Sequence, residues 1–324
     1  MVFNRFKKDY LFKKGYKLFK QNDHEEALNC YDQILRVDPN YVKAWNDKGR
    51  VLAHLKRFDE ALQLDPKYVN ALNNKGNTLT ELNHFDEALK YYNKSLKVDP
   101  GNKVSWTAKG SVLGNLRRFD EALKCYNNAL NLDPDYFRAW NNKGNLLRFL
   151  NRFDEALQCF DKALNSNPNC ALCLENRGIT LNDLNRFDEA LQCFDKALKL
   201  ESRYCFVYFN KGFSLFNLKD FEGALKYFDD ALKIDSNQDA FWGFKGFSLF
   251  NLENFDEALK CFNEALKLDP NNSTYLFYKG VTLQKLKQHD EALQCFSKAL
   301  QLDPNDEDAR KAKEQLLVKM NKST

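Results

Sequence analysis

Nine cysteines carry the most reactive side chains of this chain. Cys170 and Cys173 form a lone Cys-x-x-Cys motif, whereas a structural zinc site needs about four ligands. No second cysteine pair and no nearby histidine is available to complete such a site. We therefore expect no metal, no cofactor and a packing role for this pair, with redox use as the less favoured alternative.

Four histidines offer no catalytic constellation. His24, His84 and His289 stand at or beside one recurring slot before an acidic pair, where Phe or Arg stands elsewhere, which indicates a structural role. His54 has no obvious nucleophile or carboxylate partner. The sequence also lacks a phosphate-binding loop, a dinucleotide fingerprint and a nucleophile elbow. These observations predict that the protein is not an enzyme.

Asparagine is the residue type best suited to binding. If Trp140, Gly144 and Leu147 face a partner helix, the positions between them point elsewhere. One amide offers an acceptor and two donors, so a row of amides can hold the backbone of an extended peptide regardless of its side chains. The predicted binding residues are Asn73, Asn74, Asn77, Asn141, Asn142, Asn145, Arg148, Asn176 and Asn210. The alternative is that asparagine is simply common throughout the chain.

Phenylalanine becomes frequent further along the chain, where residues 211–218 and 245–252 repeat the phrase Lys-Gly-Phe-Ser-Leu-Phe-Asn-Leu. A helix that is apolar all round is ordinarily buried all round, and an exposed apolar patch generally marks an interaction site. We predict a groove for a partner or ligand, formed by Phe206, Phe209, Phe213, Phe216, Phe244, Phe247 and Phe250. Self-association through these rings and their burial by neighbouring repeats are the two alternatives.

The elements that position these residues follow a fixed period. Nine glycines are spaced by 34 residues with one gap of 27, at Gly15, Gly49, Gly76, Gly110, Gly144, Gly178, Gly212, Gly246 and Gly280. A period in this range is typical of a stacked array of repeats. Six cysteines lie fifteen residues after such a glycine, which predicts one buried packing slot filled by Cys30, Cys125, Cys159, Cys193, Cys261 and Cys295.

One unit of the array, residues 137–170, has the pattern of a helical hairpin. Apolar residues at helical spacing predict a first helix over 137–150, followed by a turn at Asn151-Arg152. A second helix opens on Phe153-Asp154-Glu155 and stops near Pro168, since proline cannot continue a helix. One such hairpin cannot bury its apolar face alone, whereas stacked neighbours can.

These residues resemble the tetratricopeptide repeat. Its pattern of Trp, Gly, Tyr, Ala, Phe and Pro is matched in register by Trp106, Gly110, Ala122, Tyr126 and Pro134. Lysine recurs immediately before the glycine as a departure from the pattern, and its stem can lie along apolar surface while its head reaches water. The resemblance implies an all-α fold, a right-handed α-solenoid (superhelix) of antiparallel helix-turn-helix hairpins. It also implies peptide binding on a concave face, with an asparagine column at Asn74, Asn142, Asn176 and Asn210.

The predicted array spans residues 8–306, followed by a polar C-terminal capping helix over 307–320. The repeats are expected at 8–41, 42–68, 69–102, 103–136, 137–170, 171–204, 205–238, 239–272 and 273–306. The second repeat is seven residues short, and seven residues are nearly two helical turns. We therefore predict a weak joint near 58–68, with a tolerated truncation as the alternative.

Charge and hydropathy restrict the choice of partner. The net charge of +4 is weak support for nucleic acid or membrane binding, and no apolar run approaches the roughly 20 residues that cross a bilayer. The first 20 residues alternate Phe and Lys and do not resemble a signal peptide, so we expect a cytoplasmic protein. The sequence favours a non-catalytic protein–protein interaction scaffold. An RNA-binding helical-repeat protein and a self-associating scaffold, including a homodimer, are the alternatives.

Overall fold

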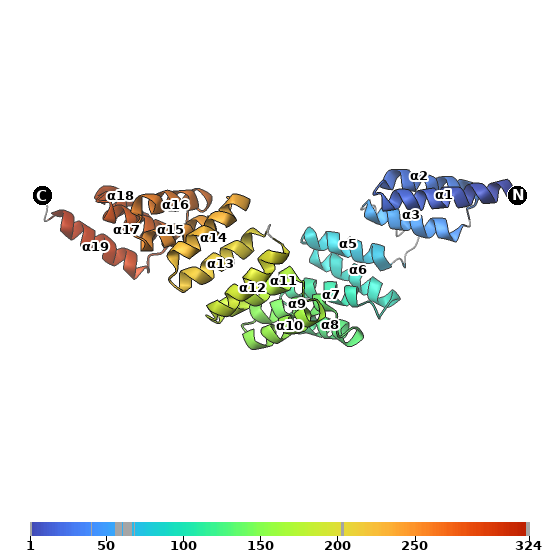
Figure 1. Cartoon of the computed structure of the whole chain (residues 1–324), viewed down its shortest axis with the longest axis horizontal. Coiled ribbons are helices and arrows are strands. Elements are labelled where there is room, and N and C mark those ends of the chain that lie inside the picture. The colour runs from blue at the N-terminus through green and yellow to red at the C-terminus, as the bar shows by residue number, and fades with distance from the viewer. Residues whose placement is uncertain are drawn as a thin grey trace. The chain divides into compact units, whose positions relative to one another are not determined.

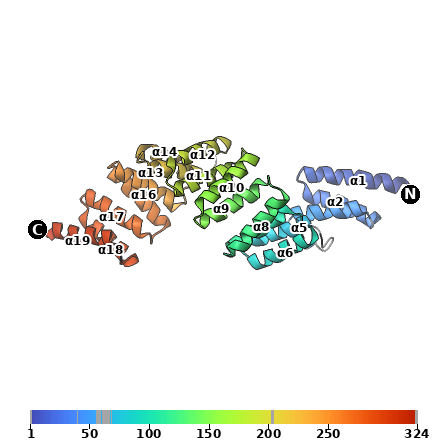
Figure 2. The same ribbon diagram turned by 90° about the horizontal axis from the view of Figure 1, so that it is seen from below.

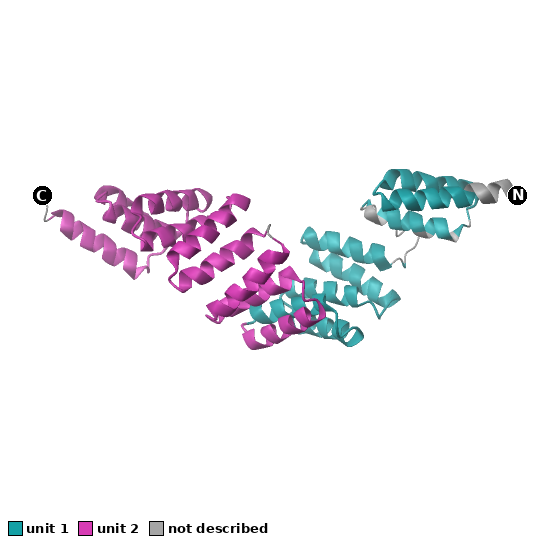
Figure 3. Ribbon diagram, viewed as in Figure 1, with its two compact units in different colours: residues 1–150 teal, residues 151–324 magenta. Residues whose placement is uncertain are grey.

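The computed structural model describes residues 2–39, 41–55, 60, 67, 69–201 and 204–321. Within these ranges every regular element is an α-helix, and no strand occurs. The chain divides into two compact units, residues 1–150 and residues 151–324 (Figure 3), and each unit is described by itself. The predicted all-α class is confirmed, as is the α-solenoid arrangement, because consecutive helices pack in pairs along each unit.

In the first unit, α1 pairs with α2, α5 with α6, and α7 with α8 (Figure 1). Each pair then packs against the next helix along the chain. The described helices of this unit are α1 (Val2–Lys20), α2 (His24–Val37), α3 (Val42–His54), α5 (Val69–Glu81), α6 (Phe85–Val98), α7 (Lys103–Asn115), α8 (Phe119–Leu132) and α9 (Phe137–Phe149).

The second unit repeats this arrangement, with α11 against α12, α13 against α14, α15 against α16, and α17 against α18 (Figures 1 and 2). The first helices of successive pairs also touch one another, from α11 through α13, α15 and α17 to α19. Its helices are α10 (Phe153–Ser166), α11 (Ala171–Asp183), α12 (Phe187–Leu200), α13 (Cys205–Asn217), α14 (Phe221–Ile234), α15 (Asp239–Asn251), α16 (Phe255–Leu268), α17 (Ser273–Lys285), α18 (His289–Leu302) and α19 (Glu307–Asn321).

The turn inside each hairpin has one residue in the left-handed region. After α7, the N–H of Arg117 donates to Gly114 O at 3.0 Å, and the N–H of Arg118 donates to Leu113 O at 2.9 Å. These bonds satisfy carbonyls that the helix end leaves unpaired. The predicted turn at Asn151 has the same conformation. The left-handed residues are Asn22, Asn83, Arg117, Asn151, Asn185, Lys219, Glu253 and Lys287, with φ between 57° and 65°.

The periodic glycines provide room for an aromatic ring of the second helix. A Cβ atom built on Gly178 would lie 2.5 Å from Cε1 of Phe194, a ring with no exposed surface. In the repeat before α9, a Cβ atom on Gly110 would lie 2.7 Å from Cε1 of Tyr126. The same contact recurs at Gly76 with Tyr92, Gly212 with Phe228, Gly246 with Phe262 and Gly280 with Phe296. The glycine is therefore required by ring packing, and every glycine for which a φ is described has a negative value.

The lysine before the glycine does more than reach water. Lys48 Nζ lies 2.7 Å from Asp32 Oδ1, on the second helix of the preceding hairpin, and 5.4 Å from the centre of its own Trp45 ring. Lys245 repeats both contacts with Asp229 at 2.6 Å and with Trp242. This departure from the family pattern thus joins successive hairpins by an ion pair.

The predicted cysteine slot is confirmed. Its six members are buried, with exposed fractions of 8% or less. Cys170 and Cys173, however, are joined by a disulfide at the start of α11, so the prediction of a pair with a packing role alone is wrong. Residue 170 caps the helix and residue 173 lies one turn later, which brings their Cα atoms to 5.2 Å, within the usual range for a disulfide.

Two sequence predictions concern the ends of the array. The weak joint near 58–68 lies outside the described residues, apart from 60 and 67. At the other end, α19 packs on α18, with Leu316 fully buried in a cluster that contains Leu283 and Phe296. The division into nine repeats and the capping role of α19 stay predictions. No described helix is both long and apolar enough to cross a membrane.

Candidate functional site

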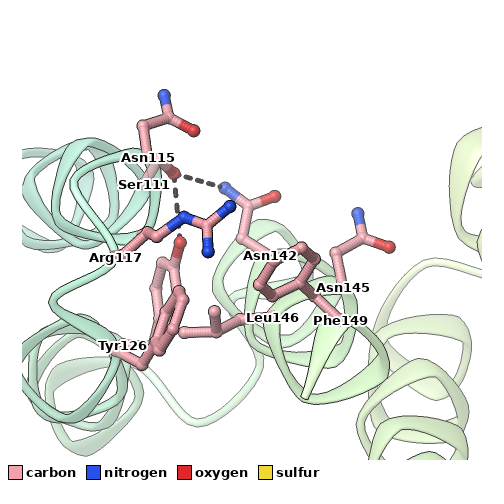
Figure 4. A pocket seen from close by; sticks show the side chains of 10 residues that line it. Ser111, Asn115, Arg117, Tyr126, Asn142, Asn145, Leu146 and Phe149 are labelled. Atoms are coloured by element: carbon pink, nitrogen blue, oxygen red, sulfur yellow. Dashed lines mark hydrogen bonds between the residues drawn. The ribbon is translucent and has the colours of Figure 1, made fainter. Parts of the chain in front are cut away.

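A pocket of about 500 Å³ lies in the first unit, where α7 and the turn after it face α9 (Figure 4). Both helices are the first members of their hairpins, so this is the face on which the sequence places the binding residues. The pocket is lined by Ser111, Gly114, Asn115, Arg117, Phe119, Tyr126, Asn142, Asn145, Leu146 and Phe149. Its volume falls in the range of pockets that hold small ligands or a few side chains.

A closed hydrogen-bond network forms one wall of the pocket. Ser111 Oγ donates to Thr107 O at 3.2 Å, and it accepts from the Tyr126 hydroxyl at 3.3 Å and from Asn142 Nδ2 at 3.2 Å (Figure 4). Burial raises the pKa of Tyr126 to about 12, so its hydroxyl keeps the proton that it donates. Ser111 is fully used by these three bonds, and it fixes the position of the Asn142 amide.

Two polar groups of the pocket remain available. Asn145 Oδ1 is buried and accepts no hydrogen bond in the described structure. Arg117 is exposed, and no carboxylate of the described residues forms an ion pair with its guanidinium. A buried acceptor without a donor costs free energy, about 1–3 kcal/mol in mutational data, and such a group calls for a partner.

The opposite wall is aromatic. The rings of Phe119 and Phe149 lie 5.6 Å apart, at an interplanar angle of 51°. Phe149 is 62% exposed, the largest exposed fraction of any described phenylalanine. Leu146, one turn before it on α9, is buried beneath. The pocket therefore combines amides, one cation and an accessible ring.

The repeats identify the family of the chain. The family model for the tetratricopeptide repeat matches residues 69–102, 137–170, 171–204, 206–238, 240–272 and 273–306. Two further models of tetratricopeptide repeats match residues 12–69 and 117–147. The chain belongs to the tetratricopeptide repeat (TPR) family.

Solved structures agree with a TPR fold. The crystal structure of YrrB, a TPR protein with an unusual peptide-binding site, matches with 26% identity and a TM-score of 0.52, over 59% of this chain and 99% of that one. The APC/C heterotetramer Cut9–Hcn1 matches with 17% identity and a TM-score of 0.59, over 95% and 75%. The protein pilF of Pseudomonas aeruginosa matches with 20% identity and a TM-score of 0.59, over 68% and 96%. A search of curated proteins found no match.

The structure corrects the placement of several predicted TPR asparagines. Asn73, Asn141 and Asn176 are buried, so the prediction that they lie free of the core is wrong. Asn73 Oδ1 accepts from Ser105 Oγ at 2.8 Å, a bond between successive hairpins. The helix wheel misjudged them because it considered only contacts inside one hairpin, whereas the preceding hairpin covers this position.

The other predicted polar residues differ in their surroundings. Asn142 and Asn145 line one pocket together, as the sequence predicts for residues of one helix face. Asn74 is exposed on α5, and Asn77 Oδ1 accepts from the Tyr92 hydroxyl of its own hairpin at 2.7 Å. In the second unit, Asn210 is partly buried on α13. Arg148 is partly exposed on α9 and does not line the pocket.

The predicted phenylalanine groove is largely filled by its own rings. Phe209 stacks on Phe241 with centroids 4.8 Å apart, and Phe247 lies 4.7 Å from Tyr278 of α17. Phe244 is the centre of this cluster, because it contacts Phe209, Phe213, Phe216, Phe228 and Phe247. Phe250 packs on Phe255 and Tyr278. Of the seven predicted residues only Phe206 is classed as exposed, at 49%, so burial by neighbouring repeats accounts for most of the row.

Sequence reasoning missed the residues that other elements bring to the pocket. Ser111, Phe119 and Tyr126 come from α7 and α8, and Arg117 comes from the turn between them. Comparison between repeats could have found two of them. Arg117 stands where four other hairpins have asparagine, and Phe149 stands where the neighbouring repeats have Asn115 and Asp183.

Proposed function

We propose that this TPR chain is a non-catalytic scaffold for protein interactions, and that its first unit binds an extended peptide segment in the pocket between α7 and α9. Stacked helical repeats generally present extended binding surfaces. YrrB, 26% identical over the shared region, is a TPR protein with a peptide-binding site. The aromatic cluster of the second unit serves packing in this proposal, since its rings are engaged with one another.

The observation that carries the proposal is the pair of amides on α9. Asn142 is held by Ser111 and has a second amide N–H to offer, while Asn145 Oδ1 has no donor. Asn115 adds a third, exposed amide from α7. Because each amide both donates and accepts, the three can pair with the N–H and C=O groups of an extended backbone.

The proposal predicts a loss of affinity in the double variant Asn142→Ala/Asn145→Ala. Peptides selected on the wild-type protein from a phage library of random twelve-residue sequences should bind the variant about tenfold or more weakly, since each hydrogen bond contributes about 0.5–1.5 kcal/mol. Fluorescence polarisation with labelled peptides measures this difference. Asn93→Ala, an exposed asparagine on the second helix α6, is the matched control and should bind as wild type.

Stability separates a binding role from a structural one. Removing Asn145 also removes a buried acceptor without a partner, so Asn145→Ala alone should unfold at the same or a slightly higher urea concentration than wild type. Selected peptides that bind the double variant with unchanged affinity would contradict the proposal. So would a library that yields no binding peptide at all.

A further inference from the structure

The pocket between α7 and α9 has a sign of charge that its peptide must match. Arg117 is the one charged side chain among the ten lining residues, and none of them is acidic. In Figure 4 its guanidinium extends from the turn toward Asn142, on the side of the pocket where Ser111 and Asn115 lie. A guanidinium has five donors in a fork that fits a carboxylate.

Neighbouring arginines show that Arg117 is in an unusual situation. Arg118 donates from Nε and Nη2 to the two carboxylate oxygens of Glu121, at 2.7 and 2.8 Å. Arg152 and Arg186 hold Glu155 and Glu189 in the same way. Arg117 has no such partner within the described part of the chain, although it is the arginine that lines the pocket.

The backbone at Arg117 does not account for an arginine. Its φ of 57° lies in the left-handed region, which asparagine adopts more readily than most residues. Asn22, Asn83, Asn151 and Asn185 occupy the equivalent turn position in other hairpins. An arginine at this position gains nothing locally over asparagine, and its long side chain reaches the pocket instead.

The charge of the surrounding sequence has the same sign. Residues 1–150 contain 26 Lys and Arg against 18 Asp and Glu, a net charge of +8. Residues 151–324 contain 23 against 27, a net charge of −4. A positive field attracts acidic segments and raises their association rate, and salt screens this attraction.

We propose that the pocket selects an acidic segment, with Arg117 binding a carboxylate of the peptide while Asn145 Oδ1 accepts a backbone N–H beside it. This inference rests on the proposed function and adds the chemistry of its ligand. The exposed Phe149 ring lies against an apolar side chain near the acidic residue. The carboxylate is that of an Asp or Glu side chain or of the C-terminus of the peptide, and the two sources are distinguished below.

The test uses immobilised hexapeptide mixtures, each with one defined central residue and random flanks. One set is acetylated and amidated, and a second set ends in a free carboxylate. The full chain should be retained about tenfold more by the capped Asp and Glu mixtures than by the Asn and Gln mixtures. If the carboxylate is that of the terminus, every mixture of the second set should be retained more than its capped counterpart.

Arg117→Asn is the decisive variant, because asparagine suits this turn and the fold should be kept. It should remove the preference for carboxylates, whereas Arg118→Gln, its neighbour outside the pocket, should keep it. Raising the salt from about 0.05 to 0.5 M should weaken the wild-type preference and leave retention by the Asn and Gln mixtures nearly constant.

The outcomes separate the two proposals. Retention by wild type without a preference for carboxylates in either set, or a preference that survives Arg117→Asn, overturns the acidic specificity and leaves peptide binding standing. Retention no greater than that of Asn142→Ala/Asn145→Ala on every mixture overturns both.

Discussion

Single residues in this protein are decided by their neighbours in adjacent hairpins. Asn73 and Asn142 both stand in first helices, yet one is buried against Ser105 and the other lines a pocket beside Ser111. The disulfide between Cys170 and Cys173 is a second case, since seven further cysteines of the chain remain free thiols. Side-chain type alone does not distinguish these situations.

The disulfide leads to a prediction about thiol counts. Denatured protein alkylated without reductant should carry seven modified cysteines, and reduction should raise the number to nine, as read by intact mass. Cys173→Ser should lower the free energy of unfolding by about 2 kcal/mol through loss of the crosslink. Cys205→Ser, at a partly exposed free thiol, is the control and should leave stability nearly unchanged. Nine modified cysteines before reduction would contradict the disulfide.

At the scale of the helix pair, one contact recurs throughout the array. The glycine of each first helix accommodates an aromatic ring of the second, and the lysine or arginine before that glycine pairs with an aspartate of the preceding hairpin. The first contact holds a hairpin together, and the second joins successive hairpins. Helix formation and stacking are thus encoded in adjacent residues.

The ring contact predicts opposite effects for two glycine substitutions. Gly178→Ala should lower the free energy of unfolding by about 1–2 kcal/mol, because the new methyl group would meet the buried Phe194 ring at 2.5 Å. Gly114→Ala should raise it by about 0.5–1 kcal/mol, since its nearest neighbour would be Leu146 at 4.0 Å and alanine favours the helix. Urea unfolding monitored by circular dichroism measures both, and equal signs would contradict the packing described.

At the scale of the whole chain, burial of acidic protons couples stability to pH. Burial raises the pKa of Tyr126 to about 12 and the pKa of Cys261 to about 11, and burial also raises the pKa values of Tyr31 and Tyr275. A group whose pKa is raised on folding stabilises the native state below its unfolded pKa. That stability is lost as the pH rises toward the folded value.

We therefore expect the array to unfold more readily in alkali. The contribution of Cys261 should disappear between about pH 9 and 11 and that of Tyr126 between about pH 10 and 12, each by roughly 2–3 kcal/mol at most. Urea midpoints at pH 8, 9.5 and 11 should fall in that order. Tyr126→Phe should lessen the fall above pH 10, and phenylalanine is tolerated because Phe194 and Phe262 fill the same slot. A flat profile would contradict this interpretation.

The sequence by itself determined the all-α class, the hairpins, their turns and the buried cysteine slot, because these depend on contacts that recur every 34 residues. It also identified Asn142 and Asn145, which share one face of one helix. Only the tertiary structure showed that the phenylalanines cover one another and that Arg117 and Phe149 join the asparagines in one pocket. The reason is physical: a helix wheel describes the contacts of one helix, whereas burial of Asn73 and accessibility of Phe149 depend on side chains from the next hairpin.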